Sequence, residues 1–198
     1  MEKIILEPVW QISDTTFDKL YPERVRQLSG KHWTPMEIAK KSARFLASEP
    51  GSKILDIGSG AGKFCLIGAY HFPSSVFYGI EQREDLYQVA VSAKEVTDSQ
   101  NVHFFFGNLT QFDHTQFDHF YFYNAFYENL VSDGQIDQLV PYSAELYHYY
   151  SRYLYNILES KTNGTRLVTF HSLEDEVPPC YQLVDATLDL NLKMWVKR

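Results

Sequence analysis

The sequence has few cysteines and no excess of positive charge. Its 198 residues include 2 cysteines, and 18 basic residues against 25 acidic ones give a formal net charge of −7. Cys65 and Cys180 suggest no disulfide framework, so we expect reduced thiols and a cytoplasmic location. Because an acidic chain lacks the charge that holds nucleic acid non-specifically, we expect a protein or small-molecule partner in preference to nucleic acid.

Long apolar runs, internal repeats and clusters of metal ligands are missing as well. The apolar stretch in MEKIILEPVWQ is broken by Glu7 and Pro8, and it is too short for a signal segment or a spanning helix. We therefore expect no membrane association. No group of His, Cys, Asp and Glu has the spacing of a metal site, so we also expect no metal. The 44% of hydrophobic residues suffices for a substantial core. These patterns do not determine the oligomeric state.

Strand-like and helix-like segments alternate through the middle of the chain. Strand patterns run over Lys53 to Ile57, Val76 to Ile80, Val102 to Phe106 and Phe117 to Tyr123. Helix patterns begin at about Gly62 and Arg83, between the first three of these strands. Such alternation predicts a parallel sheet that is covered by helices.

The two ends of the chain differ from this pattern. Roughly thirty irregular residues precede the first strong helix pattern, TPMEIAKKSARFLASEPG, in which Thr34 and Glu37 form a predicted capping box. We therefore divide the chain into an N-terminal extension, residues 1–33, and a main domain, residues 34–198. After a tyrosine-rich helix and the strand TRLVTFHSL, alternation from Ala186 to Val196 predicts one long, half-buried antiparallel strand.

The stretch KILDIGSGAGKF, residues 53–64, has glycines at positions 58, 60 and 62, directly after a buried strand. Glycine at these positions lets the backbone pass close to a ligand, where any Cβ would collide. A phosphate-binding loop requires Ser or Thr where Phe64 stands, and a dinucleotide fingerprint requires its third glycine where Lys63 stands. The spacing that remains is D-x-G-x-G-x-G, which begins at Asp56.

This spacing resembles the first motif of the class I S-adenosylmethionine-dependent methyltransferases. The resemblance implies an α/β, doubly wound, mostly parallel seven-stranded sheet of the Rossmann-like methyltransferase fold, with an antiparallel C-terminal strand and an N-terminal helical extension. It also implies that the glycine turn holds the methionine and ribose parts of S-adenosyl-L-methionine, that Glu81 receives both ribose hydroxyls and that Asn108 accepts from the adenine amine. The implied cofactor-binding residues are Trp33, Thr34, Asp56, Gly58, Ser59, Gly60, Gly62, Glu81, Gln82, Asn108, Leu109 and Asn124.

The segment FYFYNAFYENL, at the end of the fourth strand, resembles the Asn-Pro-Pro-Tyr type motif of amino-group methyltransferases. Asn124 and Tyr127 match the ends of that motif, whereas Ala125 and Phe126 replace both prolines. The resemblance implies that Asn124, Phe126 and Tyr127 are catalytic, the asparagine accepting from the target amine while the aromatic rings stack on it. We therefore expect N-methylation of a protein side chain or a small molecule.

Other interpretations of these residues stay open at the level of sequence. A non-catalytic S-adenosylmethionine-binding regulatory module would keep the glycines without the catalytic residues, and a dehydrogenase-like nucleotide binder is disfavoured by the glycine spacing. Asn124 also suits a helix cap, and Phe126 suits the core. Trp33 is either a pocket residue or a hydrophobic staple. Glu128 and His171 stand near the same edge, and we expect them to be structural or solvated.

Overall fold

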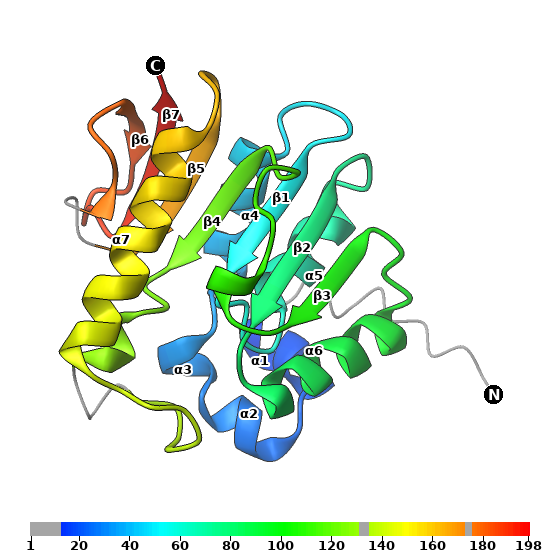
Figure 1. The fold of residues 1–198 in the computed structure, drawn as a ribbon. Helices are drawn as coiled ribbons and strands as arrows, with labels where there is room; N and C mark the ends of the chain where they lie inside the picture. The colour runs from blue at the N-terminus through cyan, green and yellow to red at the C-terminus, as the bar shows by residue number, and fades with distance from the viewer. Residues whose placement is uncertain (1–12, 131–134, 173–175) are drawn as a thin grey trace.

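The computed structural model describes residues 13–130, 135–172 and 176–198, which form one seven-stranded sheet (Figure 1). The strands are β1 (Lys53–Ile57), β2 (Val76–Glu81), β3 (Val102–Phe106), β4 (His119–Tyr123), β5 (Arg166–Phe170), β6 (Tyr181–Ala186) and β7 (Leu192–Lys197). Their order is β3-β2-β1-β4-β5-β7-β6, with β1 to β5 parallel and β7 antiparallel between β5 and β6. Residues 1–12 of the expected extension and Leu173 of the expected strand TRLVTFHSL lie outside the described residues.

Helices cover both faces of this sheet. They are α1 (Asp14–Phe17), α2 (Glu23–Gln27), α3 (Ser29–His32), α4 (Met36–Leu46), α5 (Lys63–His71), α6 (Glu84–Thr97) and α7 (Ala144–Ser160), with short 3₁₀ turns η2 (Asp18–Leu20), η3 (Leu109–Gln111) and η4 (Tyr127–Asn129). Figure 1 shows α4 and α5 behind the sheet and α7 in front of it. The doubly wound, mostly parallel sheet with an antiparallel C-terminal strand is confirmed.

The apolar core forms one cluster on each face of the sheet. Behind the sheet, side chains of the extension such as Phe17 and Tyr21 pack with α4 and α5, and Phe64 stacks on Tyr121 of β4 at a centroid distance of 3.9 Å. The cluster in front of the sheet lies beneath α7 and includes Leu154. The extension therefore shares its core with the main domain, and the division at residue 33 stays a prediction.

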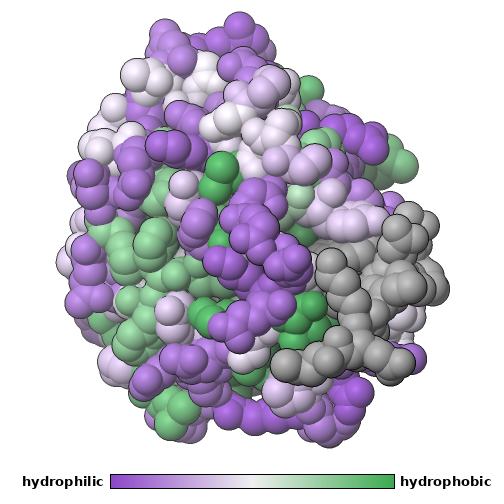
Figure 2. Space-filling model, turned by 90° about the vertical axis from the view of Figure 1, so that its right-hand side faces the viewer, coloured by the Kyte–Doolittle hydropathy of each residue, from purple (hydrophilic) through white to green (hydrophobic). Residues whose placement is uncertain are grey.

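The front face is less completely covered near β3. Within the described residues the connection from β3 to β4 contains only the short turn η3, so half-buried aromatic residues such as Tyr78 and Phe105 remain on this part of the sheet. Figure 2 looks at the β3 side of the molecule and shows hydrophobic residues gathered in patches among hydrophilic ones.

None of the helices in the described parts of the chain has the length and hydropathy needed to cross a membrane.

The prediction of one long strand from Ala186 to Val196 is wrong. The chain turns between β6 and β7, and the side chain of Asp189 stabilises the turn by accepting from the Thr187 hydroxyl and from both the backbone and the side chain of Asn191. Leu190 adopts φ +57° in this turn. Local side-chain hydrogen bonds therefore override the alternating hydrophobicity.

The predicted capping box of Thr34 and Glu37 is also wrong. The helix α4 begins at Met36, whose N–H donates to Asp14 Oδ1 over 2.8 Å. The Thr34 hydroxyl instead shares a hydrogen bond with the Tyr121 hydroxyl over 2.9 Å. A carboxylate of the extension thus stabilises the helix N-terminus in place of the local Thr34 cap.

Candidate functional site

A cavity of about 830 Å³ lies at the carboxyl ends of β1, β2 and β4. Ligands of open α/β sheets bind where the strand order reverses, and here β2 and β4 flank β1. Most of the predicted site residues line this cavity: Trp33, Gly58, Gly60, Glu81, Gln82, Asn108, Leu109, Asn124, Phe126 and Tyr127. The other predicted residues are not among those that line it: Thr34, Asp56, Ser59 and Gly62.

The glycine turn after β1 has no room for a side chain at Gly58 or Gly60. Gly58 and Gly60 adopt φ +72° and +53°, in the left-handed region that favours glycine. A Cβ on Gly58 would stand 2.4 Å from Ala125 Cβ, and one on Gly60 would stand 2.4 Å from Trp33 Cζ3. The backbone is therefore packed closely on both sides, and the turn presents main-chain atoms to the cavity.

Glu81, at the end of β2, is joined to this turn. Its Oε2 accepts from the Gly60 N–H over 2.9 Å and its Oε1 from the Arg83 N–H over 2.8 Å, while the residue is 4% exposed. Burial raises the pKa of the Glu81 carboxyl, and the two amides together with the Arg83 charge oppose this shift. A carboxylate has about four acceptor positions, so two remain for the two hydroxyls of a ribose. The free acceptor positions of Glu81 fit the ribose of the cofactor that the sequence implies.

Trp33 lies over the glycine turn from the side of the extension. Its indole Nε1 donates to the Val25 carbonyl over 2.8 Å, and the residue is buried while still lining the cavity. The two interpretations of Trp33, as a pocket residue and as a core residue, are thus compatible in this position.

Buried charges also fasten the extension to the start of α5. Lys63 is 2% exposed, and its Nζ lies 2.6 Å from Asp14 Oδ1 and 2.7 Å from Asp18 Oδ1. Since Asp14 Oδ1 also accepts from the Met36 N–H, one carboxylate connects the extension, α4 and α5. The lysine that follows the glycine motif is therefore engaged by the extension.

Asp56 is buried beneath the turn. Its Oδ2 accepts from the Cys65 thiol over 3.7 Å. Burial raises the pKa of Asp56 from 3.8 to about 8; the thiol hydrogen bond opposes this shift and the charge of Glu81 adds to it. Asp56 therefore lies beneath the turn, where burial favours the neutral form of its carboxyl.

Asn108 lines the cavity, but its side chain is already engaged. Its Oδ1 accepts from both the N–H and the hydroxyl of Thr110, over 3.1 and 3.0 Å. Its Nδ2 donates to Gln82 Oε1 over 3.1 Å and to the Tyr150 hydroxyl over 2.9 Å. Both lone pairs of the oxygen are used, so the side chain is placed to hold Gln82 and Tyr150 at the cavity wall.

The part of the cavity that the sequence predicts to hold the methyl acceptor lies at the end of β4. Asn124 adopts φ +40° directly after the strand, and its carbonyl accepts from the Tyr127 N–H over 3.0 Å. Phe126 is 7% exposed and contacts Tyr150 at a centroid distance of 5.5 Å, whereas Tyr127 is 43% exposed. The structure thus brings the predicted asparagine and aromatic residues together, with Phe126 mostly in the core.

Several lining residues were not predicted as site residues. Arg83, Tyr150 and His32 line the cavity, and so do Glu128 and His171, which the sequence left as structural or solvated. No motif marks Arg83, which lies between β2 and α6, or Tyr150, which lies on α7. Among the described residues, no group of three or more His, Cys, Asp and Glu side chains is placed to hold a metal ion.

A sheet in this order, with a glycine turn after β1 and an acid at the end of β2, defines the Rossmann-like methyltransferase fold. The chain belongs to the family described as "Methyltransferase domain", whose model matches residues 48–184. The resemblance to class I S-adenosylmethionine-dependent methyltransferases is thereby confirmed, and S-adenosylmethionine is the cofactor of this class.

Three relatives illustrate the similarity. A tRNA (guanine-N(7)-)-methyltransferase of Synechococcus sp. (strain JA-3-3Ab) is 42% identical over 55 residues, which are 28% of this chain and 23% of that protein. TrmN from Thermus thermophilus has a TM-score of 0.60 at 19% identity, over 87% of this chain and 51% of that chain. An RNA methyltransferase from Salinibacter ruber, in complex with S-adenosyl-L-homocysteine, has a TM-score of 0.55 at 22% identity, over 83% of this chain and 92% of that chain.

These relatives correct one prediction from composition. We expected a protein or small molecule to rank above nucleic acid as methyl acceptor, and this ranking is wrong, because the acceptors named for these relatives are tRNA and RNA. Net charge is a sum over the whole chain and does not describe the rim of one cavity, which here includes Lys31. At these identities the two structures show the fold alone.

Proposed function

We propose that this domain transfers a methyl group from S-adenosylmethionine to a nitrogen atom of RNA. The observation that carries the proposal is the hydrogen bond between Glu81 and Gly60, at the edge of a cavity that Asn124 also lines. S-adenosylmethionine brings a methyl group that is already activated on a sulfonium, so the protein contributes mainly binding, alignment and exclusion of water.

Each part of the cavity has a role in this proposal. The Glu81 carboxylate receives the ribose hydroxyls, and the turn at Gly58 and Gly60 allows close approach of the cofactor. The Asn124 side chain holds the target nitrogen by accepting or donating a hydrogen bond. Tyr127 offers an exposed ring to the target base, because RNA bases that are splayed out stack on aromatic side chains.

The RNA acceptor is supported by the names of the relatives and by the aromatic character of this wall. Phe126, Tyr127 and Tyr150 all line the cavity, and stacking on such rings is tolerant of base identity. The target base and the position methylated are set by contacts that the sequence does not specify.

The test begins with calorimetric titration of S-adenosylmethionine and S-adenosylhomocysteine into the purified protein, with NAD as the control ligand. We expect micromolar binding of the first two and no binding of NAD. Radiolabelled methyl transfer to bulk tRNA, followed by nucleoside analysis, then identifies the acceptor atom. Binding without transfer to any RNA would favour a non-catalytic cofactor-binding module, and absence of binding would overturn the proposal.

A further inference from the structure

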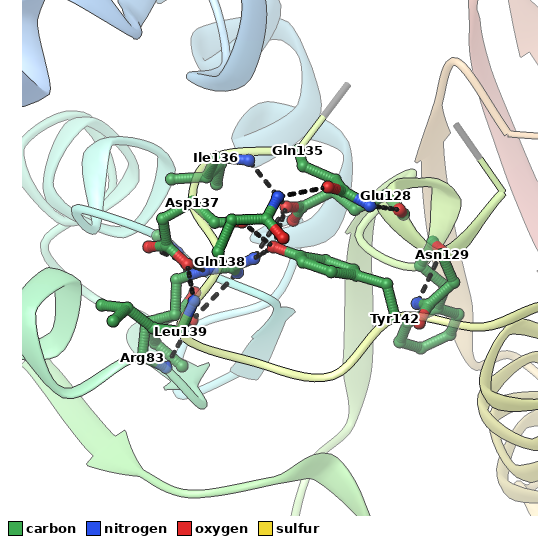
Figure 3. A network of polar contacts seen from close by, with 12 residues as sticks. Arg83, Glu128, Asn129, Gln135, Ile136, Asp137, Gln138, Leu139 and Tyr142 are labelled. Atoms are coloured by element: carbon green, nitrogen blue, oxygen red, sulfur yellow. Dashed lines mark hydrogen bonds and ion pairs between the residues drawn. The ribbon is translucent and has the colours of Figure 1, made fainter. Parts of the chain in front are cut away.

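The side chain of Arg83 lies at the centre of a polar network that joins the cofactor edge to the chain after β4 (Figure 3). Its Nη2 donates to Glu128 Oε2 over 2.7 Å and to the Tyr142 hydroxyl over 2.8 Å, and its Nε lies 3.4 Å from Asp137 Oδ2. The Arg83 side chain is 4% exposed and that of Glu128 is 14% exposed, so these contacts are partly shielded from water. Charge-assisted hydrogen bonds in such surroundings are among the strongest in proteins.

The partners of Arg83 in turn hold the backbone of residues 135–142. Glu128 Oε2 accepts from the Ile136 N–H over 3.0 Å, and Asp137 Oδ1 accepts from the Leu139 N–H over 2.9 Å. The Tyr142 hydroxyl lies 2.8 Å from the Asp137 carbonyl. Figure 3 shows the side chains of Glu128, Asp137 and Tyr142 grouped around Arg83. Removal of the Arg83 cation would leave Glu128 without its ion-pair partner, whereas Asp137 would keep Arg24, whose Nη2 lies 3.4 Å from Asp137 Oδ2.

The same arginine contacts the predicted ribose ligand. Its backbone N–H donates to Glu81 Oε1 over 2.8 Å, and its Nη1 lies 3.8 Å from that oxygen. Burial lowers the pKa of Arg83, but the negative charges of Glu128 and Glu81 raise it by more. The residue therefore remains a cation. Arg83 is therefore shared between Glu81 on one side and Glu128 with Asp137 on the other.

We propose that Arg83 is a positioning residue that couples occupancy of the cofactor site at Glu81 to the order of residues 135–142 on the acceptor side of the cavity. Hydroxyl donors that bind Glu81 compete with the Arg83 guanidinium for the negative charge of the Glu81 carboxylate. The guanidinium then interacts more with Glu128 and Asp137, and the segment is held more firmly. The coupling is reciprocal, so an acceptor that orders this segment strengthens cofactor binding by the same factor. This inference rests on the proposed function, because it takes Glu81 as the ribose ligand.

Hydrogen exchange with and without S-adenosylhomocysteine tests the coupling directly. In the wild-type protein we expect the ligand to slow amide exchange in residues 135–142 at least fivefold. In Arg83→Met the segment should exchange faster without ligand and lose its response to the ligand, although the ligand still binds within about tenfold of the wild-type affinity. Arg83→Lys should restore part of the response, because it keeps the charge but loses the planar fork.

Two further variants and one control complete the test. Glu128→Gln and Tyr142→Phe keep the shape of the network and should weaken the response of residues 135–142, which covers the case that Arg83→Met fails to fold. Arg26→Met is the matched control, because Arg26 is 40% exposed and pairs only with Glu23 among the described residues. In methyl transfer, Arg83→Met should raise the KM for the acceptor more than the KM for S-adenosylmethionine.

The outcomes separate the coupling from the function on which it rests. A ligand response of residues 135–142 in Arg83→Met equal to that of the wild type, with binding intact, would overturn the coupling alone. The coupling would also be overturned if the wild-type protein bound S-adenosylhomocysteine without any change of exchange in this segment. Absence of binding to the wild-type protein would overturn the proposed function and the coupling together.

Discussion

The backbone N–H of Gly60 donates to Oε2 of Glu81 over 2.9 Å, although the two residues are 21 positions apart. The bond makes the glycine turn after β1 and the acid at the end of β2 a single unit. The carboxylate is buried, and a second hydrogen bond directs its other oxygen toward the Arg83 N–H. A substitution of either residue is therefore expected to affect both the shape of the turn and the binding of the cofactor.

Glu81→Gln should weaken binding of S-adenosylhomocysteine about 10- to 100-fold, because a charged acceptor of the ribose hydroxyls is lost and one amide nitrogen then faces a backbone N–H. Calorimetric titration measures the affinity, and circular dichroism checks that the fold is kept. Glu84→Gln, on the exposed first turn of α6, is the matched control and should bind normally. Unchanged affinity in Glu81→Gln would remove this residue from the ribose.

Gly60→Ala should lower both the affinity for the cofactor and the stability of the domain. The new Cβ would meet Trp33 at 2.4 Å in a backbone of φ +53°, and we expect a cost of about 2 kcal/mol or more in the free energy of unfolding. Gly51→Ala is the matched control, since Gly51 also has positive φ, +83°, but no neighbour within 4 Å of a Cβ. Urea unfolding compares the two, and equal losses would show that the contact with Trp33 is unimportant.

Asn124→Ala should reduce turnover more than cofactor affinity, because the side chain is proposed to hold the target nitrogen. We expect kcat to fall about 100-fold while the affinity for S-adenosylhomocysteine changes less than threefold. Asn129→Ala, whose amide donates to the Phe126 carbonyl in the turn that follows, is the control for local structure. The opposite pattern, with affinity lost and turnover kept, would make Asn124 a cofactor ligand.

Lys63→Met should destabilise the protein by about 3–5 kcal/mol, because it leaves Asp14 and Asp18 without the cation that they share. Thermal and urea unfolding measure the loss, and limited proteolysis should show earlier cleavage in residues 13–33. Lys41→Met removes an exposed pair with Asp185 and should change stability by less than about 0.5 kcal/mol. Similar stability of the two variants would mean that the extension is held by apolar contacts alone.

The carboxyl of Asp56 makes stability depend on pH. Burial raises its pKa from 3.8 to about 8, so the native state keeps a proton that the unfolded chain releases between these values. We therefore expect the wild-type protein to lose stability as pH rises from about 4 to about 8, by at most about 1.4 kcal/mol per pH unit from this group.

Asp56→Asn removes this dependence, so the stability of the variant relative to the wild type should increase across the same window. Urea unfolding at about pH 5, 6.5 and 8 measures this difference in stability. Glu95→Gln, at an exposed position on α6, should show no such trend. A difference that stays constant or shrinks with rising pH would show that Asp56 is ionised in the native state.

Periodicity predicted the elements of the parallel sheet closely. The strand over Lys53 to Ile57 is found with the same bounds, and the glycine turn adopts the positive φ values that its composition requires. The prediction was wrong in the hairpin near Asp189 and at the start of α4, where side-chain hydrogen bonds decide the backbone path. Such bonds leave little trace in a hydrophobic pattern, because their donors and acceptors are common in exposed segments.

The sequence predicted only part of the candidate site, because some of its contacts form only between segments that are distant along the chain. Motifs mark residues such as Gly60 and Glu81 because their chemistry depends on local backbone and on strand ends. Arg83 carries no motif, and its importance depends on Glu128 and on residues 135–142, which approach it only after the sheet has formed. Asn108 is the opposite case, because the sequence predicts it as an adenine ligand. In the structure, both lone pairs of its side-chain oxygen accept hydrogen bonds from Thr110.

The sequence by itself determined the class of fold, because alternating apolar segments specify a covered parallel sheet, and it determined the position of the glycine turn, because Gly58 and Gly60 stand where a Cβ would collide with a neighbour. Only the tertiary structure decided which charges are shared: Lys63 between Asp14 and Asp18, and Arg83 between Glu81 and Glu128. The physical reason is burial. A charge that is removed from water must find a partner, and that partner depends on which segments the folded core brings together.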